Sequence, residues 1–263
     1  MLPTFRYQTE RRLRGILVMS GLVAAFGAMM LAFWPSISEA SDAITEYIDA
    51  MPDILKEAFG VTDFSTIGGF LATEMYQFVW VILLGFYFAY RAGSIVAADV
   101  ENHRIDLLLA TPVSRTRILL ERFLALVPLM ILVNLVTLPV IYGGIVLVGE
   151  SISLTRLLAV HGLSIPYFLA CASVGAVLSV VLDSESLANR LAVGAIFALF
   201  MIDTLSTTAD AGWVGAISPT RYYDSSRILV QGDIDLAGSG ILLVGAVLLV
   251  ALAVLLFRRA DIT

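Results

Sequence analysis

Six separate runs of mainly apolar residues determine what this chain can fold into. A helix needs about 20 such residues to cross a bilayer, and the runs cover residues 15–34, 68–90, 123–148, 158–182, 187–205 and 240–257. The uninterrupted apolar part of the fifth run, residues 191–202, is short, so flanking residues must complete that span. Of the 263 residues, 59% are hydrophobic and 14% are charged, which leaves no room for a sizeable soluble domain. We therefore predict an all-α polytopic membrane protein that forms a single domain over residues 1–263.

The first run could instead be a secretory signal peptide. Such a peptide has a shorter apolar region, which is followed by a cleavage site with small residues. Here the run ends in Phe33 and Trp34, and Pro35 follows. We therefore expect residues 15–34 to remain as a span, and six spans place both termini on the same side.

Basic residues are strongly segregated along the chain. Termini and loops on one side of the predicted bundle hold twelve of the sixteen basic residues, namely Arg6, Arg11, Arg12, Arg14, Arg91, Arg104, Arg115, Arg117, Arg122, Arg190, Arg258 and Arg259. The opposite side keeps the other four, and its first loop is acidic. Because cytoplasmic loops carry an excess of Lys and Arg, we predict that the basic side, with both termini, is cytoplasmic. We expect the protein to lie in the plasma membrane. Residues 91–122 then form a cytoplasmic loop, and residues 35–67 and 206–239 form extracellular loops.

The loop of residues 91–122 is the most informative polar segment. The consecutive residues Leu107, Leu108 and Leu109 are surrounded by charged side chains of both signs, and Pro112 follows as a helix breaker. This pattern predicts an amphipathic helix, a break and a second helix. A helix lying on anionic lipid would be expected to carry basic residues alone, so the acidic residues favour docking into a protein partner. A solvated connector is the alternative interpretation.

Several residues of this loop follow the pattern of a known family. The matching residues are Glu101, Leu107, Leu108, Leu109, Pro112, Val113, Ser114, Arg115 and Arg122. In this respect the loop resembles the cytoplasmic loop of type-two ATP-binding-cassette (ABC) transporter permeases. That family's pattern has an acidic residue, a Gly-Thr pair, a leucine-rich patch, and then Pro-Val-Ser-Arg with a basic residue before the next span. His103 and Arg104 replace the Gly-Thr pair, so the family's local turn cannot be assumed here.

The resemblance extends to the last third of the chain. A seven-residue motif precedes an amphipathic stretch, the last span and a basic ending. The motif consists of Ser218, Pro219, Thr220, Arg221, Tyr222, Tyr223 and Asp224. Six spans with both ends inside the cell is the family's arrangement as well. The resemblance implies short helices at the outer membrane face, over residues 213–229.

What the resemblance implies about function is a half-transporter. In that family the cytoplasmic loop supplies a coupling helix that sits in a cleft of a separate ATPase subunit. Two permease subunits, identical or different, pair with two ATPases, which bind ATP and Mg²⁺. This chain would then export an unidentified substrate. The expected coupling residues are Glu101, Arg104, Asp106 and Arg115 as transmission contacts, with Leu107, Leu108, Leu109 and Pro112 shaping the helix.

The sequence has no motif for ATP binding, for zinc-dependent hydrolysis or for hydrolysis by a serine nucleophile. A P-loop requires Gly-Lys followed by Ser or Thr, whereas the single lysine, Lys56, follows Leu55 in an acidic loop. Neither His-Glu-x-x-His nor Gly-x-Ser-x-Gly occurs, and Cys171 is the only cysteine. We therefore expect no enzyme activity, cofactor or metal in this chain. Its partners should include membrane lipid but no nucleic acid.

Two acidic residues fall inside the predicted spans. Glu74 lies in the outer half of the second run and Asp203 lies near the outer end of the fifth. Buried acids in a membrane are costly and often functional. Either residue could therefore couple substrate movement to protons or ions in a secondary transporter. No inverted repeat supports that alternative. Hydration, or hydrogen bonding of Glu74 by Tyr76 or Gln77 near the interface, is the simpler interpretation. A non-transporting membrane assembly component is the third possibility.

Small residues occupy one face of the fourth run. Ala172, Gly175, Ala176 and Ser179 recur at spacings of three and four residues. Such a face allows another helix to pack closely. The neighbouring helix could belong to the same subunit or to a second one.

Overall fold

The protein is built from helices that are long enough to cross a membrane. The structure, a computed structural model, describes residues 3–52, 54–56, 64–103, 113–208 and 211–259. Within these residues there are helices but no strands, and six helical segments have the length and apolar composition of a span. These are Leu13–Glu39, Ile67–Gly93, Arg115–Leu147, Leu154–Val181, Glu185–Thr207 and Leu236–Arg259. The prediction of an all-α membrane protein with six spans is therefore confirmed.

The spans differ in how many helical elements they contain. The first three spans and their loops contain α1 (Pro3–Glu39), α2 (Ser41–Asp49), α4 (Ile67–Leu71), η1 (Ala72–Leu84), α5 (Gly85–Gly93), α6 (Ala97–Glu101), α8 (Arg115–Leu124) and α9 (Val127–Leu147). The remainder contains α10 (Leu154–Val181), α11 (Glu185–Thr208), α12 (Gly212–Gly215), η2 (Pro219–Tyr222), η3 (Arg227–Gln231) and α13 (Leu236–Arg259). Short helices thus precede the last span, as the family resemblance implied.

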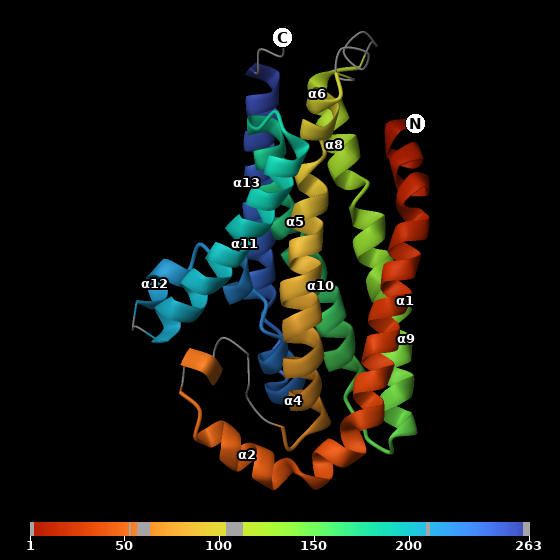
Figure 1. Ribbon diagram of the computed structural model, residues 1–263, viewed down its shortest axis with the longest axis vertical. Coiled ribbons are helices and arrows are strands. Elements are labelled where there is room, and N and C mark those ends of the chain that lie inside the picture. Colours follow the sequence, from red (N-terminus) through yellow and green to blue (C-terminus); the bar gives the residue numbers. More distant parts are fainter. Residues whose placement is uncertain (1–2, 53, 57–63, 104–112, 209–210, 260–263) are drawn as a thin grey trace.

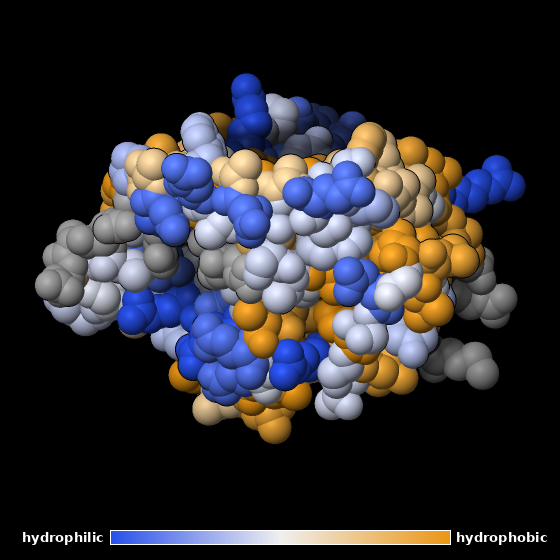
Figure 2. Space-filling view, turned by 90° about the horizontal axis from the view of Figure 1, so that it is seen from below, coloured by the Kyte–Doolittle hydropathy of each residue, from blue (hydrophilic) through white to orange (hydrophobic). Residues whose placement is uncertain are grey.

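The long helices run along the longest axis of the molecule (Figure 1). α1 packs beside α9 at one edge, and α10 packs against both α5 and α13. α1 begins and α13 ends at the same end of the bundle, which we call the terminal end, and α2 crosses the opposite, distal end. α11 leans away from the other spans toward α12. Figure 2 looks onto the distal end, where hydrophilic side chains gather among hydrophobic ones.

Local sequence signals explain where several helices begin and end. The side chain of Thr66 accepts a hydrogen bond from the backbone N–H of Gly69 (3.1 Å) at the start of α4. The hydroxyl of Ser114 accepts one from Arg117 N–H (3.3 Å) at the start of α8. Such caps satisfy amides that have no partner within the helix. After α9, Gly149 takes a left-handed conformation (φ 82°), which glycine adopts without a steric clash because it has no Cβ.

The middle of the second span, η1, is a π-helix, which the apolar pattern does not predict. A π-helix has a wider turn than an α-helix and is a rare, locally irregular element. Side chains from other elements bind its carbonyl groups. The hydroxyl of Tyr167 donates to Val81 O (2.8 Å), and that of Ser225 donates to Ala72 O (3.3 Å). Gly85 makes the first contact possible, because a Cβ there would lie 2.7 Å from the Tyr167 hydroxyl oxygen.

The predicted small-residue face lies between α10 and α5. Ala172, Gly175, Ala176 and Ser179 are all buried, and a Cβ on Gly175 would collide with the carbonyl oxygen of Ala89 in α5. The two backbones therefore approach too closely for any larger residue. This settles one open alternative, because the face meets a helix of the same chain.

The change Gly175→Ala should therefore destabilise the bundle. Overpacking of a tight contact costs about 1–3 kcal/mol, so the midpoint of thermal denaturation in detergent should fall. Gly162→Ala is the matched control, because it lies in the same helix and its Cβ would meet nothing within 4 Å. Equal midpoints for the two variants would contradict the close packing of α10 on α5.

Candidate functional site

The loop between the second and third spans lies at the terminal end (Figure 1). Its described parts are α6, which ends at Glu101, and α8, which begins at Arg115. The backbone of His103 adopts a left-handed conformation (φ 51°), so the chain turns here although the Gly-Thr pair is missing. Six predicted coupling residues lie outside the described residues and remain predictions: Arg104, Asp106, Leu107, Leu108, Leu109 and Pro112.

Glu101 connects this loop to the fifth span. Its carboxylate oxygen Oε2 accepts a hydrogen bond (2.5 Å) from the backbone N–H of Glu185, the first residue of α11. The first amides of a helix lack partners within the helix, and a negative charge near them is favourable. One end of the loop is therefore attached to the beginning of α11.

Arg115 connects the other end of the loop to the sixth span. Its guanidinium nitrogen Nη1 donates to Phe257 O (3.1 Å), and its Cζ lies 5.8 Å from the centroid of the Phe257 ring. Phe257 belongs to the last turn of α13. Carbonyl groups at a helix end lack partners within the helix, and a positive charge near them is favourable. The contact therefore holds the beginning of α8 against the end of α13.

A buried ion pair fixes the inner part of the same loop. The guanidinium of Arg122 in α8 donates to the carboxylate of Asp99 in α6 and to Ile95 O (2.5 Å). Asp99 is 8% exposed and Arg122 is 7% exposed. A charge left alone at such a depth is strongly unfavourable, so this pair holds α6 and α8 together.

The fourth span also contacts this loop, through Ser179. The Ser179 hydroxyl oxygen accepts hydrogen bonds from the backbone N–H groups of Val96 (2.7 Å) and Ala97 (3.1 Å). Both groups lie at the beginning of α6, where amides need acceptors. The described parts of the loop thus contact α10, α11 and α13.

Sequence reasoning selected Glu101 and Arg115 but missed the inner contacts. Asp99 and Arg122 have opposite charges and stand on either side of the leucine patch, which was the available signal for an ion pair. Ser179 was assigned to helix packing, and its second role depends on the position of α6, which no local pattern encodes. Contact with an ATPase stays a prediction for both selected residues.

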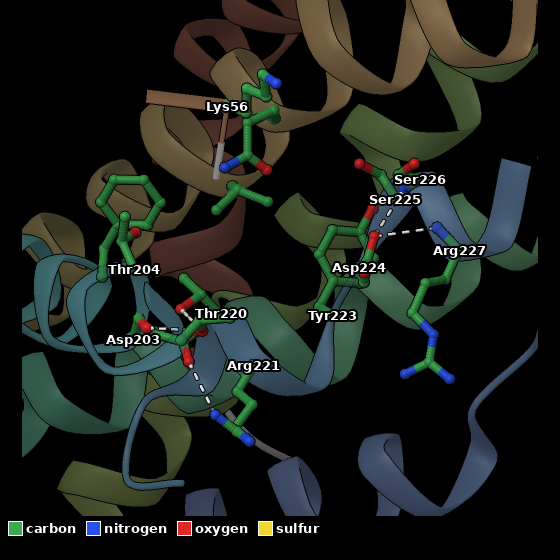
Figure 3. Close-up of a pocket in the computed structure, with 14 residues that line it drawn as sticks. Lys56, Asp203, Thr204, Thr220, Arg221, Tyr223, Asp224, Ser225, Ser226 and Arg227 are labelled. Atoms are coloured by element: carbon green, nitrogen blue, oxygen red, sulfur yellow. Dashed lines mark hydrogen bonds and ion pairs between the residues drawn. The ribbon is translucent and has the colours of Figure 1, made fainter. Parts of the chain in front are cut away.

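A second polar feature is a pocket at the distal half of the bundle (Figure 3). Its volume is about 390 Å³. Four elements, η1, α11, η2 and η3, contribute to its walls, together with Lys56 from the segment after α2. The lining residues are Lys56, Gln77, Val81, Phe200, Asp203, Thr204, Thr207, Thr220, Arg221, Tyr223, Asp224, Ser225, Ser226 and Arg227.

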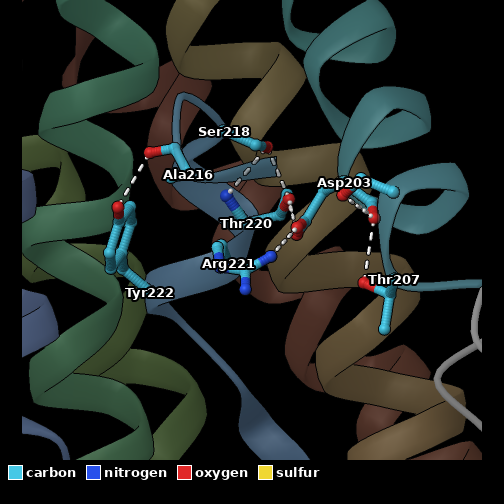
Figure 4. A network of polar contacts seen from close by, with 8 residues as sticks. Asp203, Thr207, Ala216, Ser218, Thr220, Arg221 and Tyr222 are labelled. Carbon is cyan, nitrogen blue, oxygen red and sulfur yellow. Dashed lines mark hydrogen bonds and ion pairs between the residues drawn. The ribbon is translucent and has the colours of Figure 1, made fainter. Parts of the chain in front are cut away.

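Asp203 stands in the wall of this pocket, in a network of polar contacts (Figure 4). Its oxygen Oδ2 accepts a hydrogen bond from the Thr220 hydroxyl (2.9 Å), and Oδ1 lies 3.5 Å from Arg221 Nη1. Gly215 lies close against the same group, because a Cβ there would lie 2.6 Å from Asp203 Oδ1. The carboxylate therefore joins the distal part of α11 to the segment that precedes the last span.

The segment after η2 is anchored to the bundle by hydrogen bonds to backbone carbonyls. The Tyr223 hydroxyl donates to Val160 O (2.9 Å), and Arg156 donates to Leu229 O (3.1 Å) and Val230 O (3.0 Å). Burial, and secondarily the charge of Asp224, raises the pKa of Tyr223 well above its usual value. The hydroxyl is therefore protonated and acts as a donor. One wall of the pocket is fixed in this way.

Glu74 is not among the residues that line the pocket. It is half-buried in η1. The Tyr76 hydroxyl, suggested from the sequence as a partner for Glu74, lies instead 3.4 Å from His161 Nδ1. The structure therefore does not bring Glu74 and Asp203 together in one polar site.

The sequence analysis also missed a buried polar group inside the bundle. The side-chain nitrogen of Trp80 donates to Asn134 Oδ1 (3.2 Å), and Asn134 Nδ2 donates to the Ser164 hydroxyl (3.1 Å). Thr137 and His161 extend this group, with 3.5 Å between Oγ1 and Nε2. Within the described part of the chain, no cluster of three or more His, Cys, Asp or Glu residues could hold a metal ion. The buried polar group around Asn134 therefore joins the second, third and fourth spans by hydrogen bonds.

Replacing Arg122 with Gln should strongly destabilise the protein, because Asp99 would lose a buried cationic partner. Breaking a buried pair costs about 3–5 kcal/mol, so the thermal midpoint in detergent should drop sharply. Arg227→Gln is the control, because the side chains of Arg227 and Asp233 are 53% and 48% exposed and such pairs contribute about 0–1 kcal/mol. Similar losses in both variants would contradict the role given to the buried pair.

Comparison with known proteins agrees with this arrangement. A family model described as ABC-2 family transporter protein matches residues 36–256, whereas comparison with curated proteins gives no match. The matched region includes the whole loop between the second and third spans and every residue that lines the distal pocket. This chain therefore belongs to the ABC-2 transporter family and is a membrane-spanning permease subunit, not a catalytic enzyme.

Proposed function

We propose that this permease couples ATP hydrolysis by a separate cytoplasmic ATPase to export of a substrate across the plasma membrane. The observation that carries the proposal is the attachment of the loop ends to two spans, through Glu101 and Arg115. The ATPase would bind the segment between these two residues, which contains the leucine patch. ATP and Mg²⁺ would be bound by that partner. A second permease subunit, identical or different, would complete the transporter.

The distribution of charge supports a cytoplasmic terminal end. Arg115, Arg117 and Arg122 lie in α8 at the beginning of the third span, and Arg190 lies near the beginning of the fifth. Arg258 and Arg259 end the sixth. Loops and span ends rich in arginine stay on the cytoplasmic side during insertion. A cytoplasmic ATPase could then reach the loop directly.

The fifth span offers a path from this loop to the distal pocket. α11 begins at the Glu101 contact and carries Asp203 in the pocket wall. Near its beginning α11 lies close to α5, because a Cβ on Gly93 would lie 2.6 Å from Asn189 Oδ1. A displacement of the loop would tilt α11 about this close contact. The tilt would change the width of the pocket at the other end.

The secondary-transporter alternative depends on acids that are available to bind a proton or cation. Both oxygens of Asp203 already face donors, Thr220 and Arg221. This arrangement favours a structural role for Asp203. Glu74 lies outside the pocket, so a coupling site at Glu74 would be separate from Asp203.

Removing both loop contacts should uncouple the pocket from the ATPase. Cys171 is buried, so a cysteine introduced at the exposed Thr207 would be the main reactive thiol. In the complex with the co-purifying ATPase, its labelling rate by a membrane-impermeant maleimide should change when ATP and vanadate are added. Combining Thr207→Cys with Glu101→Gln and Arg115→Gln should abolish that change while the ATPase stays bound, because the loop would no longer hold α11 and α13.

Arg190→Gln provides the matched control, because Arg190 is exposed and bonds to Ser186 within its own helix. This variant should keep the nucleotide-dependent change in labelling. An undiminished change in the variant that lacks both loop contacts would contradict the proposed path. Transport by the purified chain without any ATPase would overturn the proposed function itself.

A further inference from the structure

The distal pocket has the size and lining of a site for a small polar ligand. Its volume of about 390 Å³ falls within the range of about 300–1,000 Å³ that is typical of ligand sites. Most of its lining residues are charged or carry hydroxyl or amide groups. Apolar ligands would leave these groups without partners, which is unfavourable.

The basic residues of the pocket already contact other parts of the chain. The Arg227 guanidinium pairs with Asp233 at 2.5 Å, and Arg221 Nη1 lies 3.5 Å from Asp203 Oδ1. Lys56 Nζ donates to a backbone carbonyl at the end of α2 (3.2 Å). Lys56 and Arg221 also lie on opposite sides of the pocket (Figure 3). An anionic ligand would therefore have to displace one of these groups from its present contact.

The acidic residues of the pocket already have donors. Asp203 Oδ2 accepts a hydrogen bond from the Thr220 hydroxyl (2.9 Å). Asp224 Oδ1 accepts hydrogen bonds from the backbone N–H groups of Ser226 (2.9 Å) and Arg227 (3.0 Å). A cationic ligand would have to compete with these donors. The pocket therefore suits an uncharged ligand better than an ion of either sign.

Three hydroxyl groups of the pocket already use their hydrogen atoms. Thr207 and Thr220 both donate to Asp203, the first to its backbone oxygen (3.0 Å) and the second to Oδ2. Ser225 donates to Ala72 O (3.3 Å). A hydroxyl has a single hydrogen but accepts through its lone pairs, so these groups can only accept further hydrogen bonds. A ligand that contacts them must supply the donors.

Gln77 offers both kinds of hydrogen-bonding group to the pocket. It belongs to η1, lines the pocket and is half-buried. Among the residues that the structure describes, none forms a hydrogen bond with its side-chain amide. A carboxamide holds an acceptor oxygen and an N–H donor side by side. Two neighbouring hydroxyl groups of one ligand can satisfy both at once.

Sugars and other polyols meet these requirements. They are uncharged, and they carry a hydroxyl donor on most of their carbon atoms, whereas an amide carries donors only on its nitrogen. The apolar side chains of Val81 and Phe200 also line the pocket. These side chains can contact the C–H groups of a sugar ring, in the mixture of apolar and polar contacts that is usual in ligand sites.

We propose that the distal pocket binds an uncharged, hydroxyl-rich ligand, with Gln77 as the main contact. The hydroxyl groups could belong to a soluble sugar or to the sugar headgroup of a lipid. Naming this ligand as the exported cargo rests on the proposed function, whereas binding itself requires only this chain. A failure to bind would therefore leave the proposed coupling intact.

Calorimetric titration of the purified full chain, in a detergent without sugar groups, provides the test. Glucose and maltose are the uncharged probes. Protonated glucosamine and glucuronate keep the ring of glucose but carry a charge, and N-acetylglycinamide is uncharged but has no hydroxyl. The dissociation constant should be about tenfold lower for an uncharged sugar than for these three compounds, because each of them loses about one hydrogen bond or competes with an existing contact.

Octyl glucoside below its micellar concentration presents the same ring as a lipid headgroup, and octyl tetraethylene glycol is its control for the alkyl chain. Binding of glucose or maltose identifies a soluble sugar as the source. Binding of octyl glucoside, without binding of the soluble sugars or of the control, identifies a headgroup. Both outcomes support the proposal.

Gln77→Leu should weaken binding of the uncharged sugar at least about tenfold, because the amide contacts are lost. Gln231→Leu is the matched control, because Gln231 is exposed at the end of η3 and does not line the pocket. Thermal midpoints confirm that both variants are folded. The proposal is overturned if no sugar probe binds, if the charged analogues or N-acetylglycinamide bind as tightly as the sugar, or if Gln77→Leu keeps the affinity.

Discussion

Two hydrogen bonds join charged side chains of one loop to the backbone ends of two spanning helices, and the proposed coupling depends on them. Each helix end has amides or carbonyls without partners in the helix, and these groups attract a charge of opposite sign. Glu101 meets the amide end of α11, and Arg115 meets the carbonyl end of α13. Both side chains flank the segment that resembles a coupling helix. The loop is therefore attached to those spans by its own ends, whichever partner it binds.

Other parts of the bundle are fixed more firmly around these contacts. α10 packs on α5 through Gly175, while the buried pair of Asp99 and Arg122 holds α6 to α8. α11 leans away from the remaining spans in Figure 1 and connects the loop to the distal pocket. This contrast suits a motion in which α11 moves against a stable scaffold. The pocket would then respond at one end to a movement that begins at the other.

The sequence was sufficient for the six spans, because length and apolar composition are local properties. The charged loop pattern also singled out Glu101 and Arg115. Their partners could not be predicted, because these are the backbone groups of Glu185 and Phe257, which have no signature in residue type. Two carbonyls of the π-helix in the second span likewise accept hydrogen bonds from hydroxyls that lie far away in the sequence. Lys56 was considered from the sequence as part of an acidic loop, and only the fold places it in the wall of the distal pocket.

Distances between spin labels test the central claim most directly. One pair joins the exposed positions Asn102 and Leu187, on either side of the contact between Glu101 and Glu185. The other pair joins Leu147 at the distal end of α9 to Thr207 in α11. When ATP and vanadate are added to the complex with the ATPase, the first distance should stay constant and the second should change. A change in the first distance while the second stays constant would contradict the account.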